Sequence, residues 1–356
     1  MRNIKVLVVD DSAFMRKIIS DMINDDPCME VIGTARNGED FLNKLSSNFW
    51  KVYPDVVTLD VEMPRMDGIA ALRELKRRGI FIPVIVLSSI SKEGTKLTME
   101  CLEAGAFDFL PKPSGTISLD IEKIKINLIK KIRAACRNVK KSVNVSDAVP
   151  VSAVHGENGE IGGTRKNIDA VVIGASTGGP KALYSVITKF PEDMGVPVFV
   201  VQHMPSGFTK AFAERLDSNS DIKVMEAQDS MNAVKNTVYI APGGFHMEVW
   251  RDKKIHLNKE PAIWGVRPSV DKLFLSASRV YGGNIISAVL TGMGRDGANG
   301  TVEIKKGGGI TISEAESTCT IYGMPKAAYA TGKVDLVLPV DKIASEILKI
   351  IKLGRR

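Results

Sequence analysis

The first third of the chain alternates short apolar runs with longer amphipathic segments. The five runs are four to six residues long and rich in Val, Ile and Leu; they are Ile4–Val9, Glu30–Ala35, Asp55–Leu59, Pro83–Leu87 and Phe107–Leu110. Between them, segments such as Gly68–Arg78 repeat apolar residues at helical spacing. Continuous apolar strands separated by helices are typical of a parallel sheet covered on both faces. We therefore predict a doubly wound, five-stranded parallel α/β domain over residues 1–120.

The rest of the chain predicts a helix, a linker and a second α/β domain. Apolar residues at helical spacing predict a helix over Asp120–Arg137, and Lys140–Asn167 has no apolar period, so we assign residues 121–168 to the last helix of the first domain and a flexible basic linker. A second α/β domain, with a mainly parallel sheet, is expected over residues 169–356, closed by a helix at Asp341–Ile351. Its predicted strands are Ala170–Ile173, Pro197–Gln202, Val238–Ala241, Ile285–Leu290 and Ile310–Ile312.

The distribution of charge argues against a nucleic-acid partner. The 356 residues carry a formal net charge of +7, but residues 121–168 alone carry 10 basic and 4 acidic side chains. Neither predicted domain is basic enough for a nucleic-acid-binding face. No apolar run approaches the roughly 18–20 residues of a membrane span, so membrane insertion is not expected. The four cysteines lie far apart with no Cys-x-x-Cys spacing, which favours reduced thiols and a cytoplasmic location.

Polar residues follow the predicted strands of the first domain. Asp10 and Asp11 follow the first strand, Asp60 the third, Ser88 the fourth and Lys112 the fifth. The carboxyl ends of parallel strands meet at one edge of the sheet, so these side chains are expected to converge. Acidic residues also cap helices, but that reading does not explain the whole set. Three converging carboxylates need a cation between them, and their oxygen ligands suit Mg²⁺.

These residues resemble the receiver domain of bacterial two-component response regulators. The resemblance is carried by Val8-Val9-Asp10-Asp11-Ser12, by Leu59–Gly68, which includes Asp60-Val61-Glu62-Met63-Pro64, and by Pro111-Lys112-Pro113. It implies that Asp60 accepts a phosphoryl group from a chemotaxis histidine kinase. It also implies the following Mg²⁺ site and switch residues: Asp11, Asp60, the Glu62 carbonyl and, through water, Asp10 as the metal site; Lys112 as the phosphate partner; Ser88 and Phe109 as the hydroxyl and aromatic switch positions.

A glycine-rich turn opens the second domain. Gly174–Pro180, with Ser176 at its centre, follows one predicted strand and precedes a helix. This pattern fits a Gly-x-Ser-x-Gly elbow, in which glycines permit a sharp turn that exposes a nucleophilic serine. A glycine-rich strand–turn–helix can also hold phosphate, so the motif alone leaves both functions open. It lacks the Gly-x-Gly-x-x-Gly spacing and the Walker lysine, which weakens the nucleotide-binding alternative.

A serine nucleophile needs a base and an acid that orients it. Of the four histidines, His203 lies at the end of a predicted strand and is the best base, whereas His155 lies in the linker and His246 and His256 lie on a predicted hairpin. Asp296 follows another strand and could orient the imidazole; alternatively it only caps the next helix. The order Ser…His…Asp differs from that of α/β hydrolases.

The second domain resembles the catalytic domain of the chemotaxis protein-glutamate methylesterases. The motifs that carry the resemblance are Gly174–Pro180, Gln202–Pro205, Ala241–Gly244 with His246, Arg267–Asp271, Thr291–Gly297 and Tyr322–Pro325. It implies a serine hydrolase that removes methyl groups from glutamate γ-methyl esters of the cytoplasmic helices of chemoreceptors, and that deamidates glutamines. It gives Ser176, His203 and Asp296 the catalytic roles and suggests the backbone at Met293 as an oxyanion donor. The turn after the serine offers the N–H of Thr177 as another candidate. No cofactor is expected for the ester chemistry.

A receiver tethered to an esterase also suggests control. We expect the unphosphorylated receiver to inhibit the esterase and phosphorylation of Asp60 to activate it. A DNA-binding response regulator is the competing class, but it needs a small basic helix-turn-helix output, and residues 169–356 have a net charge of only +4. A catalytically inactive scaffold that binds receptors through the same cleft is the other alternative.

Overall fold

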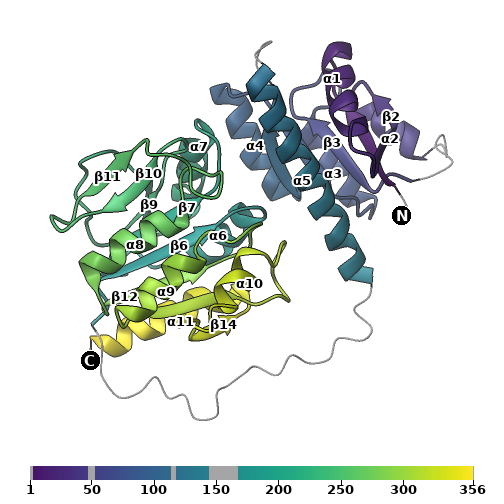
Figure 1. Cartoon of the computed structure of the whole chain (residues 1–356). Coiled ribbons are helices and arrows are strands. Elements are labelled where there is room, and N and C mark those ends of the chain that lie inside the picture. Colours follow the sequence, from purple (N-terminus) through teal and green to yellow (C-terminus); the bar gives the residue numbers. More distant parts are fainter. Residues whose placement is uncertain (1–2, 47–52, 114–117, 144–166, 356) are drawn as a thin grey trace. The chain divides into compact units, whose positions relative to one another are not determined.

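The computed structural model describes residues 3–46, 53–113, 118–143 and 167–355 (Figure 1). The chain divides into two compact units, residues 1–147 and 148–356. Most of the predicted linker, residues 144–166, lies outside the described residues, as does His155.

The first unit is built on a five-stranded sheet whose pairs are all parallel. The strand order is β2-β1-β3-β4-β5, which is a doubly wound order. The strands are β1 (Ile4–Val9), β2 (Met29–Ala35), β3 (Val56–Asp60), β4 (Val84–Ser88) and β5 (Asp108–Pro111). Every residue of β3 and β4 is buried, as expected for strands covered on both faces.

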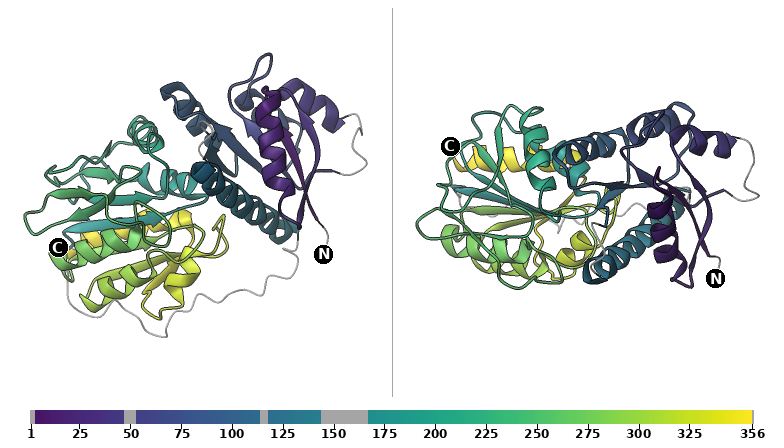
Figure 2. Two further views of the ribbon diagram at one scale, coloured as in Figure 1. Left: turned by 45° about the horizontal axis from the view of Figure 1, so that its top comes forward. Right: turned by 90° about the horizontal axis from the view of Figure 1, so that it is seen from above.

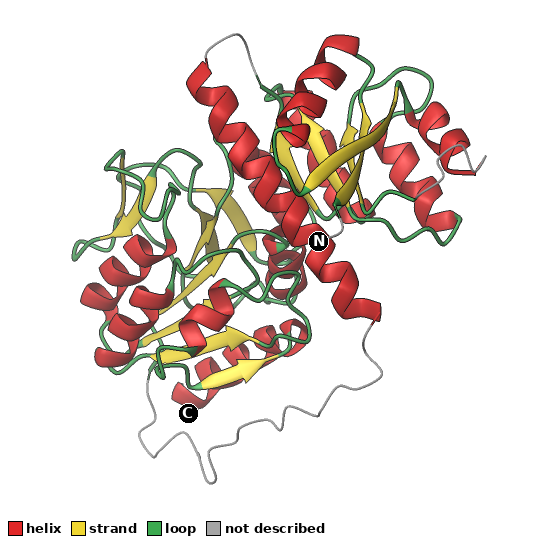
Figure 3. Cartoon of the chain, turned by 45° about the vertical axis from the view of Figure 1, so that its right-hand side comes forward, coloured by secondary structure: helices red, strands yellow, loops and turns green. Residues whose placement is uncertain are grey.

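Five helices accompany this sheet (Figure 3). They are α1 (Ala13–Asn24), α2 (Gly38–Ser46), α3 (Gly68–Arg77), α4 (Lys92–Ala104) and α5 (Ser118–Val143). Helix α1 packs beside α5, and α3 lies between α2 and α4. Side chains fix where the helices begin: the Ser12 hydroxyl accepts the N–H of Met15, and the Asp67 carboxylate accepts the N–H of Ala70 at 2.7 Å.

The second unit contains a seven-stranded parallel sheet in the order β14-β13-β12-β6-β7-β9-β8. Its strands are β6 (Ala170–Ala175), β7 (Val198–Gln202), β8 (Lys223–Glu226), β9 (Thr237–Ile240), β12 (Ile285–Val289), β13 (Ile310–Glu314) and β14 (Leu336–Leu338). Strand β6 comes first in the chain and lies inside the sheet. The next strands in the chain, β7 to β9, lie on one side of it, and β12, β13 and β14 lie on the other side. The direction of winding thus reverses at β6, which makes this the switch point of the sheet.

Helices lie on both faces of this sheet (Figure 2). Helix α6 (Gly179–Ile187) contacts α7 (Phe208–Asp217) and α11 (Val340–Gly354). Helix α9 (Ala298–Lys306) contacts α8 (Val270–Tyr281) and α10 (Met324–Tyr329). An antiparallel hairpin of β10 (His246–Val249) and β11 (Ile255–Asn258) packs on α8.

The architecture confirms the predicted fold class. The strands expected in each unit are all present within one or two residues at most ends, and the region of His246 and His256 is the predicted hairpin. Sequence analysis missed the edge strands β8 and β14, and the helix expected over Asp120–Arg137 runs further, from Ser118 to Val143. None of the described helices is both long and apolar enough to cross a membrane.

Candidate functional site

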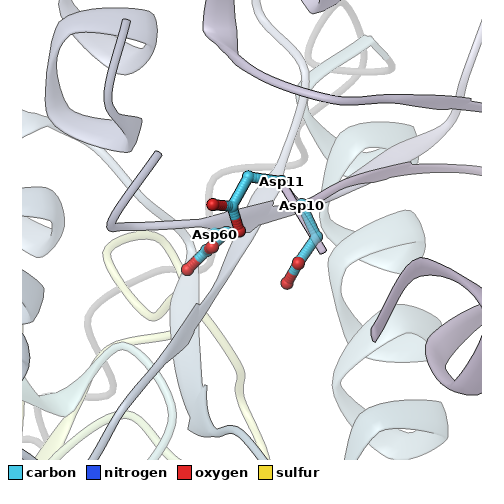
Figure 4. Close-up of side chains that lie close together, drawn as sticks. All are labelled: Asp10, Asp11 and Asp60. Carbon is cyan, nitrogen blue, oxygen red and sulfur yellow. The ribbon is translucent and has the colours of Figure 1, made fainter. Parts of the chain in front are cut away.

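The first unit gathers three carboxylates at the carboxyl edge of its sheet (Figure 4). Asp10 and Asp11 follow β1, and Asp60 ends the adjacent strand β3. One carboxylate oxygen from each lies within 4.8 Å of those of the other two. The Lys112 ammonium group, just after β5, lies 2.9 Å from Asp10 Oδ2 and 2.7 Å from Asp60 Oδ2. These residues therefore form one cluster.

Burial and charge make this cluster electrostatically unfavourable without a cation. Asp10 and Asp60 are almost fully buried. Burial, together with the nearby charge of Asp10, raises the pKa of Asp60 to about 6 against the opposing effect of Lys112. The pKa of Lys112 is raised by its ion pairs with Asp10 and Asp60, although burial alone would lower it.

The donor set fits a divalent cation. Three carboxylates face a single lysine, so the cluster keeps an excess of negative charge. Among the described residues, the Oδ2 atoms of Asp10 and Asp60 have only Lys112 as a close polar partner. Hard oxygen ligands of this kind suit Mg²⁺.

The other predicted receiver residues lie on or just after β3, β4 and β5. The backbone N–H of Lys112 donates to the carbonyl of Ser88 at 2.8 Å, and the Ser88 hydroxyl donates to the Gly94 carbonyl at 2.9 Å. Phe109 is buried in β5. The carboxylate of Glu62 accepts a hydrogen bond from the Ser89 hydroxyl at 2.7 Å. The Glu62 side chain is therefore occupied in the β4–α4 loop, which leaves its carbonyl as the group expected to face a metal.

The second unit brings the candidate catalytic residues together at the switch point. Ser176 directly follows β6, His203 directly follows β7, and Asp296 lies in the segment after β12. Strands β7 and β12 pair with β6 on its two sides. The backbone N–H of His203 donates to the Ala175 carbonyl at 3.0 Å, and that of Ser176 donates to the Thr291 carbonyl at 3.0 Å. The three segments are therefore joined edge to edge.

Asp296 holds His203 and is itself held at a helix N-terminus. Its Oδ2 lies 2.8 Å from His203 Nε2. Its remaining partners belong to the start of α8 and to its own loop; they are Val270 N–H at 2.7 Å, Ser269 Oγ at 2.8 Å, Asp271 N–H at 2.9 Å and Gly297 N–H at 3.1 Å. Asp296 therefore does more than cap the helix that follows it. Its carboxylate caps α8, which lies earlier in the chain, and also binds His203.

This arrangement determines which histidine nitrogen can act as a base. Burial would raise the pKa of Asp296, but the hydrogen bond and charge of His203, with the N–H groups of Asp271 and Val270, hold that pKa below its usual value. An ionised carboxylate only accepts hydrogen bonds, so the proton sits on Nε2. Among the described residues, Nδ1 of His203 has no hydrogen-bond partner.

The turn around Ser176 is shaped by close backbone packing. Gly178 has φ of +77°, which favours glycine. A Cβ added at Gly292 would lie 2.7 Å from Ser176 Cβ, so Gly292 lets the loop after β12 approach the serine. Among the described residues, the Ser176 hydroxyl has no hydrogen-bond partner. It is therefore not engaged in a structural role.

The two predicted oxyanion donors belong to the two segments that meet at the serine. Thr177 follows it in the elbow, and Met293 follows Gly292 in the loop after β12. Thr177 is buried, and its carbonyl accepts a hydrogen bond from the Thr291 hydroxyl at 3.1 Å. Within the described part of the chain, neither backbone N–H donates to a protein acceptor. Both remain available to a ligand.

Sequence analysis missed several residues that support this site. The Gln202 amide NH₂ donates to the Ser176 carbonyl at 2.9 Å and to the His203 carbonyl at 3.1 Å, so one side chain joins nucleophile and base. Gly179 makes room for it, because a Cβ there would lie 2.0 Å from Gln202 Oε1. Buried Glu314 accepts the N–H of Thr291 at 2.7 Å. In the sequence, Gln202 stands next to His203 in one of the motifs that carry the family resemblance, but nothing there indicates its contact with Ser176.

The other two histidines in the described part of the chain do not join this cluster. His246 is buried in β10, and its Nε2 bonds the Pro261 carbonyl at 3.1 Å. Burial lowers its pKa, so it is uncharged at neutral pH. His256 stacks on Trp250, with ring centroids 3.9 Å apart. His203 is therefore the histidine that the structure places beside Ser176.

Comparison with known proteins identifies both units. Residues 6–122 match the response regulator receiver domain, and residues 171–347 match the CheB methylesterase domain. A protein-glutamate methylesterase/protein-glutamine glutaminase of Clostridium acetobutylicum is 58% identical over the full length of both chains. One from Pyrococcus horikoshii is 46% identical over 99% of this chain and 95% of its own. The Thermotoga maritima CheB methylesterase catalytic domain aligns with a TM-score of 0.50 and 42% identity, covering 52% of this chain and 99% of that domain.

Fold and site thus define a response regulator whose output unit is a hydrolase. More specifically, the chain belongs to the family of protein-glutamate methylesterases/protein-glutamine glutaminases.

Proposed function

We propose that the chain is a phosphorylation-activated serine hydrolase that removes methyl groups from glutamate γ-methyl esters of chemoreceptors and deamidates receptor glutamines. The observation that carries this proposal is the pairing of His203 with the buried Asp296 at 2.8 Å, one strand away from Ser176. A phosphate-binding loop would not need a buried acid–imidazole pair at this position. The family relationship supports the choice of substrate.

In the proposed mechanism, the Ser176 hydroxyl oxygen attacks the ester carbonyl carbon while His203 Nδ1 accepts its proton. Ionised Asp296 stabilises the resulting imidazolium through Nε2. The N–H groups of Thr177 and Met293 stabilise the oxyanion. The C–O bond to the methoxy group breaks, and His203 returns the proton to release methanol. Water, activated by His203, then cleaves the glutamyl ester of Ser176 to give glutamate. With a glutamine substrate, the first leaving group is ammonia.

The receiver unit would supply the control. Asp60 would attack the phosphoryl group of a histidine kinase, and Lys112 would neutralise negative charge on the phosphoryl oxygens. Asp10, Asp11 and the Glu62 carbonyl would hold Mg²⁺, which supplies further charge neutralisation when bound. We propose that phosphorylation relieves inhibition of the esterase by the receiver. If a chain lacking residues 1–139 had unchanged or lower esterase activity, the proposal that the receiver inhibits the esterase would be wrong.

The direct test is methanol release from methylated receptor membranes, with and without a small phosphodonor. We expect release by the wild-type chain, an increase with the phosphodonor, and a loss of orders of magnitude in Ser176→Ala. An Asp60→Asn variant should keep basal release and lose the increase. Near-wild-type release by Ser176→Ala would refute the serine mechanism. Labelling of Ser176 by a serine-directed phosphonate separates the enzyme from an inactive scaffold.

A further inference from the structure

A strained, exposed aromatic turn lies close in the structure to the catalytic acid. Ile263 and Val266 exchange two backbone hydrogen bonds of 3.1 and 3.0 Å, so Trp264 and Gly265 form a two-residue turn. Trp264 has φ of +54° and is 52% exposed. A left-handed conformation is unfavourable for a residue other than glycine. An exposed indole gains little burial to offset that cost, so packing alone does not explain this residue.

The indole is fixed relative to Asp296. Its Nε1–H donates to Asp271 Oδ2 at 3.1 Å. Asp271 is buried at the start of α8, and its other oxygen accepts the N–H groups of Gly297 and Gly300 at 2.9 and 2.7 Å. The N–H of Asp271 in turn donates to Asp296. Trp264 is therefore two hydrogen bonds away from the residue that holds the catalytic histidine.

Arg295, the residue before Asp296, lies on this indole. Its guanidinium carbon is 4.7 Å from the ring centroid of Trp264, in a cation–π contact. Arg295 is exposed, and among the described residues no carboxylate pairs with it. The contact with the ring orients the guanidinium and leaves its N–H groups available.

Two other cations of this region, Arg267 and Lys272, are held by protein oxygens. Arg267 donates to the carbonyls of Lys259 and Glu260, both at 2.8 Å. Lys272 pairs with Glu260 at 2.7 Å and lies 3.7 Å from Glu248. Arg295 and Lys259, which lies over the Phe245 ring at 4.9 Å, are thus exposed cations of this region that an aromatic ring orients without a carboxylate partner in the described structure, and Arg295 is the one next to Asp296 in the chain.

We infer that Trp264 and Arg295 form a subsite for a carboxylate side chain that the protein substrate carries near the reacting ester. This inference rests on the proposed function. Arginine can bind a carboxylate with two parallel hydrogen bonds, and the indole can cover the apolar stem of the same side chain. We take the acidic residue and the ester to lie about one helical turn apart, roughly 5 Å, because side chains at that spacing share one face of a helical substrate.

The test compares two helical peptides that carry one glutamate methyl ester. They differ only in a neighbour one turn away, which is aspartate in one peptide and asparagine in the other. With the full-length chain and a small phosphodonor, we expect the aspartate peptide to have a roughly five- to tenfold lower KM at equal kcat. Arg295→Ala should abolish this preference, and Arg295→Glu should reverse it. Arg279→Ala, an exposed arginine at the far end of α8, is the matched control and should retain the preference.

A binding measurement separates the subsite from the chemistry. In the Ser176→Ala chain, the aspartate peptide should change the fluorescence of Trp264, and the added Arg295→Ala substitution should weaken that binding by a similar factor. Equal KM values and equal binding of the two peptides would overturn the subsite. If neither peptide released methanol, the proposed function would be wrong, and the binding measurement would still decide whether the subsite exists.

Discussion

Replacing Asp296 with Asn should damage the fold of the catalytic unit as well as its chemistry. Nearly all partners of the carboxylate are donors, so either orientation of an amide points its NH₂ at backbone N–H groups. If the NH₂ replaces Oδ2, it meets the N–H of Val270; if it replaces Oδ1, it meets those of Asp271 and Gly297. A buried donor left without an acceptor costs about 1–3 kcal/mol. Loss of a negative charge at the start of α8 costs about 0.3–2 kcal/mol more. We expect a total destabilisation of about 2–4 kcal/mol.

The assay is urea unfolding followed by tryptophan fluorescence, because two of the three tryptophans, Trp250 and Trp264, belong to this unit. Ser176→Ala is the matched control, since the serine hydroxyl has no partner among the described residues and its loss should leave the midpoint unchanged. An Asp296→Asn chain that unfolds at the same urea concentration as Ser176→Ala would refute this reasoning.

The same substitution has two further consequences. An amide facing Nε2 can donate to it and move the histidine proton to Nδ1, so kcat should fall by about 10⁴, as in the serine-protease template. The lowered pKa of Asp296 means that its carboxylate stabilises the folded state above the unfolded pKa of about 3.9. That stabilisation is lost as pH falls through the lower pKa of the folded state. Asp296→Asn should therefore be less acid-sensitive than Ser176→Ala below about pH 4.

Three further predictions concern the supporting residues. Gln202→Glu should lower kcat about 10- to 100-fold with little change in KM, because a carboxylate cannot donate to two carbonyls; equal kcat values would contradict this. Burial raises the pKa of Glu314, so stability should fall as pH rises above about 4.3, and Glu314→Gln should flatten that slope in urea unfolding. Mg²⁺ should raise the thermal midpoint of the first unit, and Asp10→Asn should weaken this effect, as calorimetry would show.

The fold could be predicted because its strands are buried on both faces. Runs such as those of β3 and β6 must be apolar throughout, and that pattern is visible in the sequence. The edge strands β8 and β14 are three or four residues long and partly exposed, so they leave no apolar run to detect. Helix α5 runs past Arg137 because no Gly or Pro stands between that residue and Val143.

The candidate site could be predicted where its residues follow strands of the sheet. Ser176 and His203 directly follow β6 and β7, so sheet geometry alone places them side by side. Asp296 follows the next strand, but its strongest contacts are with the start of α8, 25 to 27 residues earlier in the chain. No local sequence pattern indicates that a helix N-terminus binds a carboxylate from a different loop. Asp271 accepts N–H groups at the start of α9, and this contact could not be predicted from the sequence for the same reason.

The exchange of carboxylates between the starts of α8 and α9 bears on how such a chain could change over evolutionary time. The Asp271 carboxylate accepts N–H groups at the start of α9, and the Asp296 carboxylate accepts N–H groups at the start of α8. Substitution of either residue would therefore leave backbone donors of the other helix without an acceptor. Most substitutions are tolerated only while stability stays above a threshold. A descendant that no longer needed to hydrolyse esters would be free to lose Ser176 early, whereas Asp296 would persist. In such a lineage, retention of the catalytic acid would report on folding rather than on activity.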